Sequence, residues 1–131
     1  MIYVGWGNTA REYIVWKFVN DWTVEDYKEA LEKTAQFISD TGNVPLLVDV
    51  RRIQGDTFDI LKNPELHRLK LPVKHVILIS MPDALHAIYN FLSPLFAGYD
   101  VQFELVDDVD LAYSLIAKYR TSSTNNENRT G

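Results

Sequence analysis

The chain has 131 residues, a length that suits one domain with a buried core and leaves little room for a second. Hydrophobic residues make up 47% and charged residues 24%, and no apolar run approaches the ~20 residues that a membrane-spanning helix needs. The net charge of −5 disfavours attraction to nucleic acid or to anionic lipid. The absence of cysteine excludes disulfides, thiol catalysis and Cys-ligated metal, and it is compatible with the cytoplasmic location that we expect.

The first predicted elements are two strands that form a hairpin. Residues 1–6 and 13–19 are rich in β-branched and aromatic side chains, and residues 7–12 between them have the composition of a turn. Because residues 1–6 already have the pattern of a strand, we recognise no secretory signal there.

The best-specified element is the helix that follows. Thr23 is suited to cap its start, with Asp26 three residues on, and Trp22 and Tyr27 can pack against each other across the cap. Gly42 is suited to end the helix in a left-handed conformation. Three- and four-residue spacing predicts one buried stripe, formed by Val24, Tyr27, Leu31, Thr34, Ala35 and Ile38.

Two strands with short helices between them are predicted next. Residues 44–50 form a nearly continuous apolar run, as a strand covered on both faces requires, and residues 73–80 contain a second such run. Between them, Thr57 can cap a short helix that continues to about Leu61. A second short helix is expected over residues 63–70, where Asn and Pro begin it.

The last part of the chain is predicted to contain two helices and one strand. The helix over residues 83–98 is kinked or ended early by Pro94, and residues 101–105 alternate as a strand near a sheet edge. Asp107 is suited to cap the final helix, whose expected stripe is Val109, Ala112, Leu115, Ile116 and Tyr119. Residues 121–131 have no aliphatic or aromatic side chain, and we expect a disordered tail.

The predicted order ββαβαβαβα indicates one α/β domain over residues 1–120, with a single mixed β-sheet, an N-terminal hairpin and about four helices. This order resembles the STAS fold of anti-sigma-factor antagonists, and more closely the SpoIIAA-like proteins. The sequences Thr23-Val24-Glu25-Asp26-Tyr27 and Leu46-Leu47-Val48-Asp49-Val50 carry the resemblance. It implies a non-enzymatic protein-interaction module with a regulatory role.

A phosphorylation or anion site is the first candidate for function. Phosphorylatable STAS members have an Asp-Ser or Asp-Thr pair near the position of Asp56-Thr57, but Phe58-Asp59 stands here where that family has small residues, so we expect no working phosphoswitch. Physically, a phosphate on Thr57 would lie at a helix N-terminus close to Arg51 and Arg52. The alternatives are that Thr57 only caps its helix and that the arginines are solvated or pair with Asp49 and Asp56.

An interaction surface is the second candidate. The helix over residues 83–98 has more apolar side chains than one buried stripe accommodates, namely Leu85, Ile88, Tyr89, Phe91, Leu92, Leu95 and Phe96, with Ala84 and Ala87. A protein partner, a second copy in a homodimer or an apolar ligand could cover them, and so could the domain's own core.

Other kinds of chemistry have less support. His67, His75 and His86 lack metal-ligand spacing and are interpreted as surface or edge histidines, so we expect no metal and no other cofactor. No glycine-rich phosphate loop or nucleophile elbow is present, and we assign no catalytic residue. The alternative function is binding of a small anionic or apolar, lipid-like ligand, and a small enzyme ranks last.

Overall fold

The computed structural model describes residues 1–53, 73–80 and 102–130, with side chains as far as Tyr119. Its five strands form one sheet in the order β1-β2-β3-β4-β5, in which β1 is antiparallel to β2 and the other neighbours are parallel. The strands are β1 (Ile2–Trp6), β2 (Ile14–Asn20), β3 (Leu46–Ile53), β4 (His75–Ile79) and β5 (Gln102–Val106). The α/β class, the mixed sheet and the N-terminal hairpin are therefore confirmed. The helices predicted near Thr57 and over residues 83–98 lie outside the described residues.

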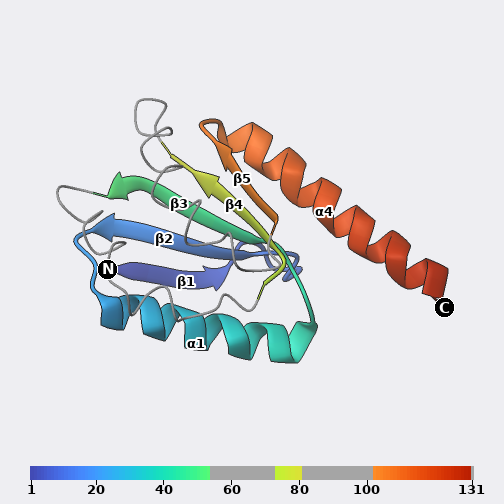
Figure 1. The fold of residues 1–131 in the computed structure, drawn as a ribbon, viewed down its shortest axis with the longest axis horizontal. Coiled ribbons are helices and arrows are strands. Elements are labelled where there is room, and N and C mark those ends of the chain that lie inside the picture. The colour runs from blue at the N-terminus through green and yellow to red at the C-terminus, as the bar shows by residue number, and fades with distance from the viewer. Residues whose placement is uncertain (54–72, 81–101, 131) are drawn as a thin grey trace.

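Two helices of the described residues lie on opposite faces of the sheet (Figure 1). Helix α1 (Val24–Thr41) packs on one face and α4 (Val109–Thr130) on the other. Among the described strands, β5 forms one edge of the sheet, as its alternating pattern predicted, and β1 forms the other. Each face is thus covered by its own apolar cluster.

The turn between β1 and β2 depends on a glycine. The Gly7 N–H donates to the Tyr13 carbonyl over 2.8 Å, and a Cβ at Gly7 would lie only 1.9 Å from the Tyr13 ring. Asn8 Oδ1 accepts a hydrogen bond of 3.0 Å from the Glu12 N–H, as an asparagine in a turn commonly does. Only glycine leaves room for Tyr13 here, so the ring position and the turn are coupled.

The start of α1 has the predicted capping box. Thr23 Oγ1 accepts from the Asp26 N–H and Asp26 Oδ2 accepts from the Thr23 N–H, both over 3.1 Å. The Trp22 and Tyr27 rings lie 6.1 Å apart, which confirms that they pack across the cap. Gly42 has φ of 88° and donates to the Ile38 carbonyl at the end of the helix. Both ends of α1 are therefore set by its local sequence.

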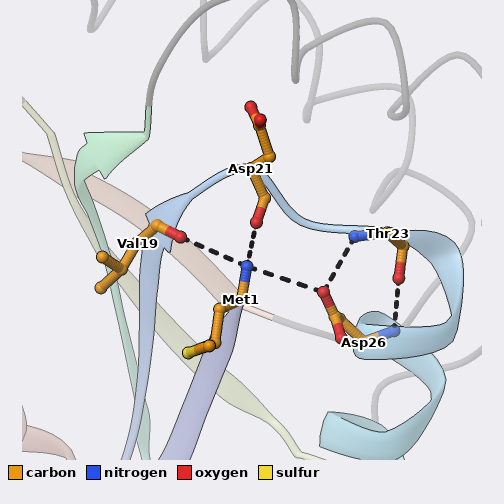
Figure 2. Close-up of polar contacts among 5 residues, drawn as sticks. All are labelled: Met1, Val19, Asp21, Thr23 and Asp26. Atoms are coloured by element: carbon orange, nitrogen blue, oxygen red, sulfur yellow. Dashed lines mark hydrogen bonds and ion pairs between the residues drawn. The ribbon is translucent and has the colours of Figure 1, made fainter.

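The first strand is fastened to this cap. Figure 2 shows the Met1 ammonium group donating to the carbonyls of Val19 and Asp21 and lying 3.6 Å from Asp26 Oδ2. Because Asp26 also accepts from Thr23, one carboxylate joins the start of β1 to the start of α1.

The core on the α1 face is rich in aromatic side chains. Trp16 packs edge-on against Tyr27, and Trp16 Nε1 donates to Thr34 Oγ1 over 2.7 Å. The stripe of α1 is buried as predicted at Tyr27, Leu31 and Thr34, but Ala30 is buried in place of the expected Ala35, which is exposed. The fully enclosed members of this cluster also include Ile14, Phe18, Trp22, Leu46, Val48, Val73, Val76 and Leu78.

The core on the α4 face is smaller. It consists of Leu47, Ile77, Ile79, Val106, Ala112, Ile116 and Tyr119, and it confirms the stripe predicted for the last helix. The cap is Asp108 rather than Asp107: its Oδ1 accepts from the Asp110 N–H over 2.9 Å, because β5 continues to Val106 and delays the helix.

The end of α4 differs from the sequence prediction. The helix continues to Thr130, whereas the sequence predicted a disordered tail from residue 121. Its C-terminal part extends beyond the sheet (Figure 1). A helix satisfies its backbone hydrogen bonds internally, so a backbone without apolar side chains can still be helical.

Candidate functional site

The carboxyl end of β3 carries a charged pair on the face that α4 covers. Side chains alternate along a strand, and Leu47 belongs to the α4-side core while Val48 belongs to the α1-side core. Asp49 therefore points to the α4 side, and Arg51 lies on the same side because its guanidinium is hydrogen-bonded to Asp49. Asp49 is paired in register with Lys17 of β2. The carboxyl ends of parallel strands are where open α/β sheets commonly bind ligands.

Asp49 holds the Arg51 side chain in one orientation. Arg51 Nε donates to Asp49 Oδ1 over 3.0 Å and Nη2 donates to Oδ2 over 2.8 Å, and the Arg51 backbone N–H also donates to Oδ1 over 3.0 Å. The residue Asp49 is only 7% exposed, whereas Arg51 is exposed. Two hydrogen bonds to one buried carboxylate fix a guanidinium that still reaches the surface, and the third fixes the Arg51 backbone.

The charge of Asp49 is maintained despite its burial. Burial acts to raise the pKa of Asp49, but the hydrogen bonds from Arg51 and the charges of Arg51 and Lys17 act the other way, and the pKa is lowered overall. The same carboxylate raises the pKa of Arg51 through the hydrogen bonds between them. The pair is therefore ionised at neutral pH.

One tyrosine, Tyr113 of α4, lies near this pair. The rings of Tyr13 and Tyr113 meet edge to face with centroids 6.3 Å apart, and burial, with the neighbouring Tyr113, raises the pKa of Tyr13. Tyr113 on α4 is 49% exposed and close enough to Arg51 to affect its electrostatics. We call Arg51 and Tyr113 the Arg51 surface; Tyr13, whose hydroxyl donates to the Gly7 carbonyl, packs on the Tyr113 ring.

A second polar cluster lies between α4 and the first residues of β4 and β5. The His75 ring stacks on Tyr119 with centroids 4.2 Å apart, and the Tyr119 hydroxyl donates to Glu104. Burial, and then Glu104, raises the pKa of Tyr119 to about 12. Burial lowers the pKa of His75 against the opposing effect of a hydrogen bond with Gln102, and Nδ1 of His75 is buried with no hydrogen-bond partner among the described residues. The prediction of a surface or edge position was wrong for His75, because α4 covers this interior strand.

The structure places only part of the predicted site. Arg51 pairs with Asp49, which was one of the alternatives, and Arg52 is exposed on the next position of β3. Thr57, Asp56 and the apolar side chains predicted for residues 85–96 lie outside the described residues.

Comparison with family models, curated proteins and solved structures finds no match for this chain. The resemblance to STAS and SpoIIAA-like proteins therefore rests on the two local sequences and the predicted order of elements.

Among residues 1–53, 73–80 and 102–130, no three His, Asp or Glu side chains are grouped as metal ligands would be, and no helix is long and apolar enough to cross a membrane. The Arg51 surface combines a fixed cation with one phenol, which can donate a hydrogen bond and provide flat apolar contact. The sequence prediction did not include Tyr13 or Tyr113. Tyr113 could have been identified, because it is an aromatic residue among the polar positions of the last helix.

Proposed function

We propose that the protein is a non-enzymatic interaction module of the SpoIIAA-like, STAS-related type, with about four helices and without a working phosphoswitch. The partner is a protein, and the Arg51 surface contacts it. The observation that carries the proposal is the bidentate pairing of exposed Arg51 to buried Asp49, beside a half-exposed Tyr113.

The composition of the Arg51 surface supports a protein partner. Arginine and tyrosine are enriched in the parts of protein interfaces that contribute most to affinity. Arg51 is already held by Asp49, so less side-chain entropy is lost when a partner contacts it. Tyr113 has only two side-chain torsions, so it also loses little entropy on binding while it offers a large rigid surface.

Binding of a small anion is the second reading. The Nε and Nη2 donors of Arg51, which form the fork best suited to phosphate or carboxylate, are already occupied by Asp49. The charge of Asp49 also offsets that of Arg51. This arrangement favours a protein partner over a free anion, while an apolar ligand would depend on residues 83–98.

The test compares two equally exposed side chains of α4. Tyr113 is 49% exposed and Leu111 is 47% exposed, but two residues rotate a helix by about 200°, so they lie on opposite flanks of the buried stripe. Tagged wild-type, Tyr113→Ala and Leu111→Ala proteins are purified from the source cells, and copurified proteins are quantified by mass spectrometry. We expect one protein to be lost with Tyr113→Ala and kept with Leu111→Ala. Equal recovery with all three proteins would contradict the use of this surface.

A further inference from the structure

The outer edge of β1 has backbone groups that pair with no other strand of the described residues. Val19 N–H donates to the Met1 carbonyl and Gly7 N–H to the Tyr13 carbonyl, so the odd-numbered residues of β1 form the hydrogen-bonded pairs with β2. The N–H and C=O groups of Ile2, Val4 and Trp6 then point away from β2. Within the described part of the chain, no strand pairs with β1 on that side.

This edge lacks the features that usually protect an edge strand. The sequence of β1 is IYVGW, without a charged residue or a proline, and its register with β2 has no bulge. Charged side chains, prolines and bulges are the common means by which proteins prevent edge strands from pairing with another chain. β5, at the opposite edge, contains the charged residue Glu104 and begins with Gln102, which is polar and exposed. The two edges of the sheet are thus unequal, and β1 is the one suited to pairing.

The strand is also complementary in shape to a second copy of itself. Tyr3 is 55% exposed, and a Cβ on Gly5 would meet nothing within 4 Å. Tyr3 and Gly5 point to the same face because they are two residues apart. If two copies of β1 pair antiparallel about Val4, Tyr3 of each copy lies opposite Gly5 of the other. This is a non-hydrogen-bonded pair, in which side chains approach closely, and an aromatic ring over a glycine stabilises such a pair.

The same pairing satisfies the backbone. With Val4 opposite Val4, Ile2 lies opposite Trp6 of the second copy, and these are the residues whose N–H and C=O groups point outward. Their side chains lie on the α1 face, where Trp6 stacks on Phe37 at 4.9 Å, so this apolar layer would continue from one copy to the other. No charged side chain of β1 would meet a like charge.

We propose that β1 pairs antiparallel with β1 of a second copy of the chain, centred on Val4, and joins the two sheets into one. The pairing has two-fold symmetry, which is the commonest arrangement of homodimers. It goes beyond the proposed function, since a partner can bind the Arg51 surface of a monomer or of a dimer. Failure of one proposal is therefore distinct from failure of the other.

The test uses two substitutions in β1 and a matched control on α4. Gly5→Val adds a β-branched side chain into open space, so the monomer should remain at least as stable, but the side chain occupies the place of the partner's Tyr3 ring. Tyr3→Lys removes the ring and puts a charge on the edge. Leu111→Lys places a charge at a similarly exposed position on α4.

Sedimentation velocity of the full chain over a range of concentrations, at 0.15 M salt and above, measures the dimer dissociation constant. Salt at this concentration screens the charge repulsion between the acidic residues of α1 in the two copies. Circular dichroism checks that each variant is folded. We expect the wild-type protein to be a dimer. Each substitution occurs in both copies, so Gly5→Val and Tyr3→Lys should each raise the dissociation constant about tenfold or more. Leu111→Lys should not change it. A monomeric wild type, a dimer unaffected by both β1 substitutions, or a dimer disrupted only by Leu111→Lys would overturn the proposal.

Discussion

Replacing Thr34 by valine removes one hydroxyl from the centre of the α1-side core. Thr34 is 0% exposed, its hydroxyl donates to the Ala30 carbonyl over 2.8 Å, and it accepts from Trp16 Nε1 over 2.7 Å. Valine has nearly the same volume and the same branched shape, so it leaves no cavity. The substitution therefore isolates the hydrogen bond that fastens α1 to β2.

The expected cost follows from what remains after the hydroxyl is removed. Trp16 Nε1 stays buried and loses its acceptor, and an unsatisfied buried donor costs about 1–3 kcal/mol. In a domain of this size, each kcal/mol lowers the melting temperature by about 3–5 °C. We expect Thr34→Val to lower the free energy of unfolding in urea by about 1–3 kcal/mol, with a corresponding decrease in melting temperature.

Thr41 is the matched control, because its hydroxyl donates to the Phe37 carbonyl over 2.8 Å, the same i to i−4 bond, at an exposed position. Thr41→Val should change the free energy of unfolding by less than about 0.5 kcal/mol. If Thr34→Val were as stable as the wild type, or no less stable than Thr41→Val, the bond to Trp16 would not stabilise the packing of α1 on the sheet.

Four other predictions concern pH, Thr57, the helix over residues 83–98 and the C-terminus. Burial lowers the pKa of His75 below its usual 6.5, so on acidification the unfolded chain takes up the proton first. The free energy of unfolding should decrease as the pH falls below about 6.5 and level off below the folded-state pKa, and urea titrations of His75→Gln should show a smaller decrease. Thr57→Ala should cost about 1 kcal/mol in urea unfolding, whereas Thr57→Asp should leave both folding and partner binding unchanged; loss of binding with an intact fold would restore the phosphoswitch. If a partner or a second copy covers the helix predicted over residues 83–98, one of Phe91→Glu and Phe96→Glu should dissociate that complex while remaining folded, and the other should destabilise the core, as judged by size-exclusion chromatography and circular dichroism. Truncation after Arg120 should leave the melting temperature unchanged, and a drop of several degrees would show that the final residues pack on the domain.

Local sequence was sufficient where the determinants of structure lie within a few residues of one another. The cap at Thr23 and Asp26, the glycine at residue 42 and the stripe of α4 all depend on contacts along one segment, and all were predicted. The one error in the stripe of α1 has a physical reason. Ala30 and Ala35 flank the same stripe on opposite sides, and the packing of the helix on the sheet decides which flank is buried.

Contacts between distant segments could not be predicted in this way. Periodicity indicates which face of a helix is exposed, but it does not say that Tyr113 meets Tyr13 or that Tyr119 stacks on His75. The pairing of Arg51 with Asp49 was accessible, because residues two apart on a strand point to the same face. Sequence therefore identified the arginine of the candidate site and missed Tyr113 near it.

The proposed recognition role is tested most directly by crosslinking from within the Arg51 surface. A photoreactive phenylalanine analogue is placed at Tyr113 in one protein and at Leu111 in another, and both are irradiated in the source cells. We expect a discrete protein adduct from position 113 and none from position 111, and we expect Arg51→Met to abolish the adduct while circular dichroism shows a folded domain. Identical adducts from both positions, or an adduct at 113 that persists in Arg51→Met, would contradict recognition of a protein partner by this surface.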